Sequence, residues 1–203
     1  MIWIAVAFLS GSIPFSYIIG RWLLKQDIRT VGDRNPGATN VLRASGSKSW
    51  FILAFLLDTF KGTLPVGLAY WIAGIKGAEI VLIATAAVAG HAFSPWLGWR
   101  GGKAIATTFG VWMGLTIWEL PTMLGILLLY WFRSVKESDW AVVLTWISIL
   151  PYLIFTGREP ELLGLWVCNG VILLWKHRSS LSHWPTIRRW LPVLPKTQSN
   201  GAA

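Results

Sequence analysis

The sequence predicts an all-α, polytopic membrane protein with about seven transmembrane helices. Of its 203 residues, 54% are apolar and 13% are charged, whereas soluble domains carry roughly 25% charged residues. A soluble fold of this size would leave large apolar patches in water. The 15 Trp against four Tyr also favour a membrane, because Trp concentrates at the membrane–water interface.

Seven apolar runs are expected to form the transmembrane helices. Several are shorter than the roughly 20 residues that cross a bilayer, or are interrupted by Gly and Pro, and the division near Glu119–Pro121 is the least distinct. We expect residues 1–191 to form a single transmembrane domain and the small, polar residues 192–203 to form a disordered tail. The runs cover residues 2–24, 50–74, 78–96, 103–118, 120–135, 139–157 and 160–176.

Basic residues predict the orientation of the chain. With the N-terminus outside, 15 of the 18 Lys and Arg fall in segments on the cytoplasmic side, and only Lys76 and Arg158 fall in outward loops. This imbalance is the positive-inside pattern of membrane proteins. It predicts a multi-pass protein of the cell (inner) membrane with a cytoplasmic C-terminus. It also explains the net charge of +9 without nucleic acid as a partner.

Four groups of polar residues all lie on the predicted cytoplasmic side. The first is the loop from Asp27 to Lys48, in which Asn35 suits an N-cap and Pro36 the first position of a short helix. The free N–H groups at a helix start attract phosphate, and Arg43 can add a forked contact to an anion. The alternative is an ordinary capped helix at the interface, with an Arg that sets topology.

The second group is Asp58-Thr59-Phe60-Lys61-Gly62, which lies inside an apolar run. Asp58 and Lys61 stand at positions i and i+3, so the two side chains can share a helix face and pair. Ionisable groups at membrane depth are costly and usually functional. The alternative is a structural ion pair that fixes helix packing near the inner boundary.

The third group joins His91 to a Gly-rich turn, Gly101-Gly102-Lys103. Two Gly residues before Lys103 allow backbone amides and an ammonium group to meet one anion. His91, at a helix end, can form hydrogen bonds or transfer a proton. The turn is not a Walker loop, because the glycine spacing and the following Ser or Thr are missing. The alternative is a plain turn with interfacial cations.

The fourth group, Lys176-His177-Arg178-Ser179-Ser180, follows the last apolar run. Cations at a helix C-terminus suit the helix dipole and the inner leaflet, so a structural role also accounts for this group.

Together, three anion-binding candidates and a buried ion pair predict a pocket for a phosphorylated substrate, open to the cytoplasm and the lipid. Three His and one Cys without ligand-like spacing predict no metal site. No Gly-x-Ser-x-Gly, paired-carboxylate or His-Asp acyltransfer motif occurs. Catalysis would therefore depend on positioning and charge stabilisation.

These residues resemble the bacterial acyl-phosphate:glycerol-3-phosphate acyltransferases, over about residues 10 to 183. The short motifs occur in the order of that family and within seven apolar runs, which makes the match specific. The matching stretches are Gly11–Phe15, Asp27–Arg29, Asn35 with Gly37–Arg43, Asp58–Gly62, Gly90–Phe93, Gly101–Ala104 and His177-Arg178.

The resemblance implies an enzyme that moves a fatty acyl group from acyl phosphate to the first hydroxyl of glycerol 3-phosphate. The products would be lysophosphatidic acid and inorganic phosphate. It implies no metal or other cofactor and no acyl-enzyme, with the substrate's own phosphate as the base. Membrane lipid would be a further partner. The oligomeric state stays open. The active site would face the cytoplasm, with Lys103, His177 and Arg43 as catalytic residues. The substrate-binding residues would be Asn35, Gly37, Thr39, Asn40, Arg43, Gly101, Gly102, Lys103 and Ser180, supported by Asp58, Lys61 and His91.

The chain departs from the family pattern inside the expected site. The family loop usually reads Gly-Ser-Gly-Asn, and here it reads Gly32-Asp33-Arg34-Asn35. Asp33 would repel a phosphate at contact distance by about 1 kcal/mol in water and about 4 kcal/mol near a protein surface. We expect Arg34 to offset this by pairing with Asp33 or by contacting the phosphate. Ser180 also replaces the usual Asn, and His183 stands where Arg is common.

Two alternatives to the acyltransferase follow from these features. The departures also fit a divergent paralogue that is inactive or uses another phosphorylated substrate or acyl donor. Short, interrupted spans and buried charge also suit a transporter of phosphorylated or lipid-like anions. However, no inverted repeat supports a transporter, and the polar groups gather on one side.

Overall fold

The computed structural model describes residues 1–157 and 159–188. This part of the chain is all-α, as predicted, apart from one antiparallel bridge between Val135 and Ile187. The predicted tail, residues 192–203, lies outside the described residues. The helices are α1 (Ile2–Ser12), α2 (Phe15–Ile18), α3 (Ala38–Ser45), α4 (Lys48–Gly67), α5 (Gly77–Ala92), α6 (Ile105–Thr116), α7 (Glu119–Ser134), α8 (Ser138–Ser148), α9 (Leu150–Phe155) and α10 (Pro160–His177).

Each predicted apolar run is helical, and the division near Glu119–Pro121 is confirmed, because α6 ends at Thr116 and α7 begins at Glu119. The first run is broken at Pro14, between α1 and α2. Proline lacks a backbone N–H and disfavours helix in the preceding residue. Seven crossings and their orientation stay predictions. Within the described part of the chain, the helical segments long and apolar enough to cross a membrane are Ile2–Leu23, Lys48–Ile72, Gly77–Leu97 and Ser138–Phe155.

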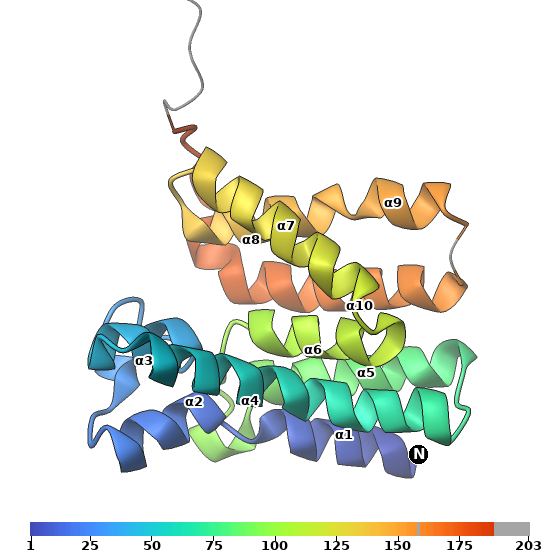
Figure 1. The fold of residues 1–203 in the computed structure, drawn as a ribbon, viewed down its shortest axis with the longest axis horizontal. Coiled ribbons are helices and arrows are strands. Elements are labelled where there is room, and N and C mark those ends of the chain that lie inside the picture. The colour runs from blue at the N-terminus through green and yellow to red at the C-terminus, as the bar shows by residue number, and fades with distance from the viewer. Residues whose placement is uncertain (158, 189–203) are drawn as a thin grey trace, which may run out of the picture.

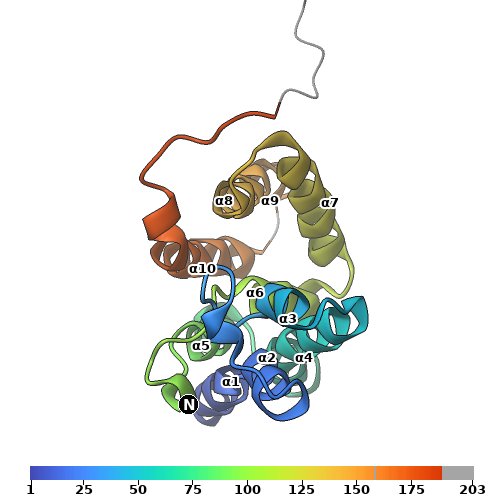
Figure 2. The same ribbon diagram turned by 90° about the vertical axis from the view of Figure 1, so that its left-hand side faces the viewer.

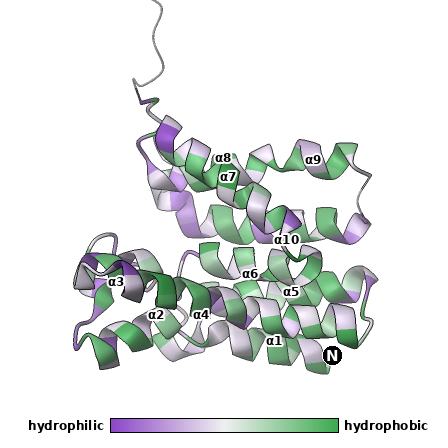
Figure 3. Ribbon diagram, viewed as in Figure 1, coloured by the Kyte–Doolittle hydropathy of each residue, from purple (hydrophilic) through white to green (hydrophobic). Residues whose placement is uncertain are grey.

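The helices form two layers, with α1, α4, α5 and α6 in one and α7 to α10 in the other (Figure 1). Hydrophobic residues cover most of the helix lengths, and hydrophilic residues gather at their ends (Figure 3). Within the described residues, the segments that the sequence assigns to the cytoplasm lie toward the end drawn on the left of Figure 1. Figure 2 looks onto this polar end, with α2 and α3 in the lower layer and α7, α8 and α10 above. The fold therefore brings three of the four polar groups to one end, while the second group, Asp58–Gly62, lies in the middle of α4.

Glycines allow the helices that carry the polar turns to pack closely. A Cβ atom on Gly90 of α5 would lie 2.3 Å from the carbonyl oxygen of Phe8 in α1. One on Gly110 of α6 would lie 2.0 Å from the carbonyl oxygen of Thr59 in α4. No larger residue fits at these separations, and small residues are the usual means of close packing between membrane helices. This packing fixes the ends of α5 and α6, between which Lys103 lies.

Candidate active site

The centre of the polar end is a carboxylate surrounded by donors. The Oδ2 atom of Asp33 lies 2.9 Å from Nζ of Lys103, and its Oδ1 lies 3.5 Å from Nη1 of Arg43. The Nδ2 group of Asn40 donates to the same Oδ1 (3.0 Å), as does the backbone N–H of Asn35 (3.3 Å). The structure thus gathers Asn35, Asn40, Arg43 and Lys103, which lie in two separate stretches of the sequence, around one anion.

The loop before α3 is organised differently from the prediction. Gly37, not Asn35, is the N-cap, and the helix begins at Ala38. The predicted start at Pro36 is wrong because the chain makes a tight turn there, in which the N–H of Gly37 donates to the carbonyl of Asn35 (2.9 Å). The Nδ2 group of Asn40 donates to the same carbonyl (2.8 Å). The turn is therefore held by the helix that follows it.

Asp33 is ionised at neutral pH. Partial burial alone would raise the pKa of this carboxyl group, but the hydrogen bond and charge of Lys103 lower the pKa below its usual value. A carboxyl group with a lowered pKa stabilises the fold above its unfolded-state value and loses this contribution as the pH falls. The pair of Asp33 and Lys103 is therefore intact throughout the neutral range.

Asp139, in the first turn of α8, is a site residue that the sequence analysis missed. Its Oδ1 atom lies 2.8 Å from Nζ of Lys103 and 2.6 Å from Nδ1 of His177. Ser180 is within hydrogen-bonding reach of the same carboxylate. No pattern in the sequence set it apart, because it follows Lys136 and Glu137 at the polar start of an apolar run.

His177 is the last residue of α10 and is fully buried. With its proton on Nδ1, the imidazole donates to Asp139, while Nε2 is buried without a hydrogen-bond partner among the described residues. The chain then folds back over the start of α8, where Trp184 stacks on Trp140 and the carbonyl of His183 accepts from the indole N–H of Trp140 (2.7 Å). The segment then reaches the turn between α7 and α8, where the N–H of Lys136 donates to the carbonyl of Thr186 (3.0 Å).

The Gly-rich turn packs against His91. A Cβ atom on Gly101 would lie 2.0 Å from the carbonyl oxygen of His91, and one on Gly102 would lie 2.2 Å from its Nε2. The N–H of Gly102 donates to that carbonyl (3.1 Å), and Nζ of Lys176 donates to the carbonyl of Gly101 (3.0 Å). Close packing thus accounts for both glycines and fixes the backbone that presents Lys103. A direct contact of their amides with substrate stays a prediction.

The predicted ion pair of Asp58 and Lys61 is confirmed, with Oδ1 and Nζ 2.7 Å apart and both side chains buried. Nζ of Lys61 also donates to the carbonyl of Ile13 (2.6 Å), which precedes the break at Pro14. The hydroxyl of Ser16 donates to Asp58. The pair therefore links α4 to the interruption between α1 and α2, which supports its structural role.

We expect Lys61→Met to lower the free energy of unfolding by about 3–5 kcal/mol, because it leaves the Asp58 carboxylate buried without its cation. Thermal unfolding in detergent or lipid would measure the change. The double variant Asp58→Asn, Lys61→Met is the control and should recover part of the loss. Equal stability of the wild type and Lys61→Met would contradict a structural role for the pair.

A pocket of about 160 Å³ opens beside Lys103, between α3, α4, α6 and α7. One part of its wall is polar and includes Asn35, Thr39 and Lys103, together with the first residues of α3. The first N–H groups of a helix have no partner within the helix and favour anions. The wall also includes Asp58 and His91, and its apolar residues are Phe51, Phe55, Ile105, Leu128 and Phe132. This lining suits an anionic group joined to a hydrocarbon chain.

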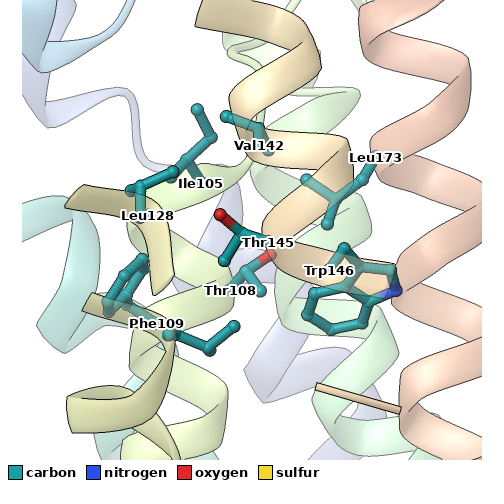
Figure 4. Close-up of a pocket in the computed structure, with 9 residues that line it drawn as sticks. Ile105, Thr108, Phe109, Leu128, Val142, Thr145, Trp146 and Leu173 are labelled. Atoms are coloured by element: carbon teal, nitrogen blue, oxygen red, sulfur yellow. The ribbon is translucent and has the colours of Figure 1, made fainter. Parts of the chain in front are cut away.

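A smaller cavity of about 20 Å³ continues the apolar side of the pocket, since both contain Ile105 and Leu128 in their walls. Figure 4 shows the side chains that surround it, from α6, α7, α8 and α10. The hydroxyl of Thr108 in this wall is buried without a partner among the described residues. The full lining is Ile105, Thr108, Phe109, Leu124, Leu128, Val142, Thr145, Trp146 and Leu173.

Comparison with known proteins assigns this arrangement to a family. Residues 1–185 match the family described as glycerol-3-phosphate acyltransferase. The chain belongs to this family. A glycerol-3-phosphate acyltransferase 1 of Thermotoga maritima is 38% identical over 193 residues, covering 88% of this chain and 94% of that protein. A family member of Desulfovibrio desulfuricans is 34% identical over 205 residues, covering 100% of this chain and 88% of that protein.

Solved structures of the family have the same fold. The glycerol 3-phosphate form of PlsY, an integral membrane glycerol 3-phosphate acyltransferase, superposes with a TM-score of 0.80 at 31% identity and covers 88% of both chains. Its lysophosphatidic acid form gives a TM-score of 0.77 at 27% identity. The chain therefore has the fold of a multi-pass integral membrane protein of the acyltransferase family.

Proposed function

We propose that the chain transfers a fatty acyl group from acyl phosphate to the first hydroxyl of glycerol 3-phosphate. Membership of the glycerol-3-phosphate acyltransferase family over residues 1–185 supports this reaction. The observation that carries the proposal is one pocket lined both by Lys103 and Asn35 and by the apolar side chains of Phe51, Phe55 and Leu128. An acyl phosphate has the same division into a charged head and an apolar chain.

The reaction needs one bond made and one broken. The hydroxyl oxygen of glycerol 3-phosphate attacks the acyl carbon and forms the ester, while the bond from that carbon to the phosphate oxygen breaks. The phosphate leaves with the electron pair and takes the hydroxyl proton, so no other base and no cofactor is required. Lys103 and Arg43 stabilise the charge on the phosphates, and preorganised charge of this kind usually contributes more to catalysis than any other single effect.

Asp139 and His177 act on this reaction as positioning residues. The hydrogen-bonded series from His177 through Asp139 to Lys103, with distances of 2.6 and 2.8 Å, holds the ammonium group at the pocket. A group held in place before the substrate arrives needs no reorganisation in the transition state. Direct contact between His177 and substrate remains a prediction from the family resemblance.

The polar end is proposed to face the cytoplasm, where glycerol 3-phosphate dissolves. The excess of Lys and Arg in the segments that the sequence assigns to the cytoplasm supports that orientation. The apolar side of the pocket, with Phe132 partly exposed on α7, gives the acyl chain a route from the lipid.

Phosphate release by the purified protein in lipid, given palmitoyl phosphate and glycerol 3-phosphate, tests the proposal. We expect release to depend on both substrates and lysophosphatidic acid to appear in equal amount. Release without lysophosphatidic acid, or none beside an active family member, would contradict the proposed reaction. Uptake of glycerol 3-phosphate into sealed vesicles without phosphate release would instead identify a transporter.

A further inference from the structure

The carboxylate of Asp33 occupies a site built for a different anion. Its oxygens are contacted by an ammonium group from Lys103, a guanidinium group from Arg43, an amide from Asn40 and the backbone N–H of Asn35. Cationic forks, amides and free backbone N–H groups are the donors that proteins use for phosphate. Two of these residues, Lys103 and Asn35, also line the pocket, so the cluster and the pocket form one site.

The charges of this cluster already balance before any substrate binds. Lys103 and Arg43 contribute two positive charges, and Asp33 and Asp139 contribute two negative charges. A doubly charged phosphate that entered the cluster unchanged would meet two carboxylates, and like charges at contact distance repel. One carboxylate must therefore move away when phosphate binds.

Asp33 is the more exposed of the two carboxylates and lies in a loop, so it is the one that can move. Asp139 lies in the first turn of α8 with 11% of its side chain exposed, and His177 and Lys103 both hold it. The side chain of Asp33 is 41% exposed and belongs to a loop. Its neighbours Gly32 and Arg34 both have left-handed backbone conformations, with φ of +56° and +61°. Arg34 adopts this conformation against its preference, which leaves the loop strained beside Asp33.

The first contact predicted for Arg34, an ion pair with Asp33, is not formed in the described structure. Arg34 is exposed, and the cations that contact Asp33 are Lys103 and Arg43. These two are the same cations that the proposed reaction needs for its phosphates. Asp33 and a substrate phosphate therefore compete for one set of donors.

We propose that Asp33 is an internal anion that occupies the phosphate site of the empty enzyme and is displaced by the phosphate group of an incoming substrate. This inference rests on the proposed function. In the empty site Asp33 keeps Lys103 and Arg43 paired and in place. It also makes binding selective for phosphate. A doubly charged phosphate displaces one carboxylate, whereas a fatty carboxylate carries the same single charge as Asp33 and gains nothing by replacing it.

The test is the affinity of Asp33→Asn for each substrate class, measured by calorimetry on the full chain in lipid nanodiscs. The two ligands are glycerol 3-phosphate and a non-hydrolysable palmitoyl phosphonate, each added alone. We expect Asp33→Asn, which keeps the shape and removes the charge, to bind at least one of them about tenfold more tightly. Tighter binding of glycerol 3-phosphate alone places Asp33 at its phosphate, and tighter binding of the phosphonate alone places it at the acyl phosphate.

Asp27→Asn is the matched control. It removes the same charge from the same loop, but its carboxylate pairs with Arg29 (2.7 Å) and not with the cluster. We expect the control to bind both ligands as the wild type does. If both variants bind the ligands more tightly by the same factor, the cause is a general change in the electrostatic field of the polar end. That outcome overturns the proposal.

Equal or weaker binding of both ligands to Asp33→Asn also overturns the proposal, since Asp33 would then assist substrate binding or take no part in it. If Asp33→Asn does not fold, Asp33→Ser replaces it in the same comparison. Neither ligand is consumed in these measurements, so the result is independent of turnover. If the wild type releases no phosphate in the assay described above, the proposed function is refuted, but the binding result for Asp33 still stands.

Discussion

Lys103→Ala is expected to lower kcat/KM by about 10²–10³-fold, the usual effect of removing one preorganised group that stabilises transition-state charge. Nζ of Lys103 lies at the pocket, 2.9 Å from Asp33 and 2.8 Å from Asp139. In the proposed mechanism, its loss removes the cation that holds the leaving phosphate. It also leaves two carboxylates at the site with less positive charge between them, which opposes binding of any phosphate. Steady-state phosphate release at varied concentrations of both substrates measures the change.

Lys136→Ala is the matched control for this experiment. Lys136 is exposed in the turn between α7 and α8, at the same polar end, and its backbone N–H donates to the carbonyl of Thr186 (3.0 Å), a bond that the substitution keeps. The control removes one positive charge from that end and should keep wild-type kinetics. Lys103→Arg, which keeps the charge but not the compact ammonium geometry, should fall between wild type and Lys103→Ala. Full activity of a folded Lys103→Ala would remove Lys103 from the site.

Most of the long helices were predictable because each lies within an apolar run that ends at polar or Gly-containing turns. The run at residues 103–118 corresponds to α6 (Ile105–Thr116), and the run at 160–176 corresponds to α10 (Pro160–His177). Hydropathy did not reveal the interruption at Pro14, because residues on both sides of it are apolar. A proline inside an apolar run is compatible with either a kink or a break.

The site was predictable only where its residues share a short segment. Asn35, Asn40 and Arg43 belong to one loop and the helix after it, so the sequence alone grouped them. Asp139 and His177 are 38 positions apart and meet because α8 begins and α10 ends at the same side of the upper layer. The error in the N-cap, Gly37 in place of Asn35, has a local cause. Asn35 suits both a cap and a tight turn, and the side chain of Asn40 favours the turn.

Asp139→Asn is expected to lower kcat by about 10–10²-fold while KM for glycerol 3-phosphate changes little. The carboxylate fixes the tautomer and orientation of the His177 imidazole, as a buried acid does for a catalytic histidine, and it holds Nζ of Lys103. An amide keeps the size but can present N–H to both neighbours, which are themselves donors. The ammonium group then loses its position rather than its charge, so the step that depends on its placement slows most.

The pH dependence of kcat distinguishes this positioning role from simple packing. Removal of a negative charge 2.8 Å from an ammonium group makes its loss of a proton easier. The alkaline limb of the kcat profile should therefore move to lower pH in Asp139→Asn, with the unfolding temperature close to that of the wild type. Glu137→Gln removes a charge two positions away, where the carboxylate accepts from the N–H of Thr186 (2.8 Å), and should leave this limb in place. If Asp139→Asn keeps both the wild-type kcat and the wild-type limb, the hydrogen bonds to Lys103 and His177 serve the fold alone, and Lys103 needs no partner from α8 to reach the phosphate.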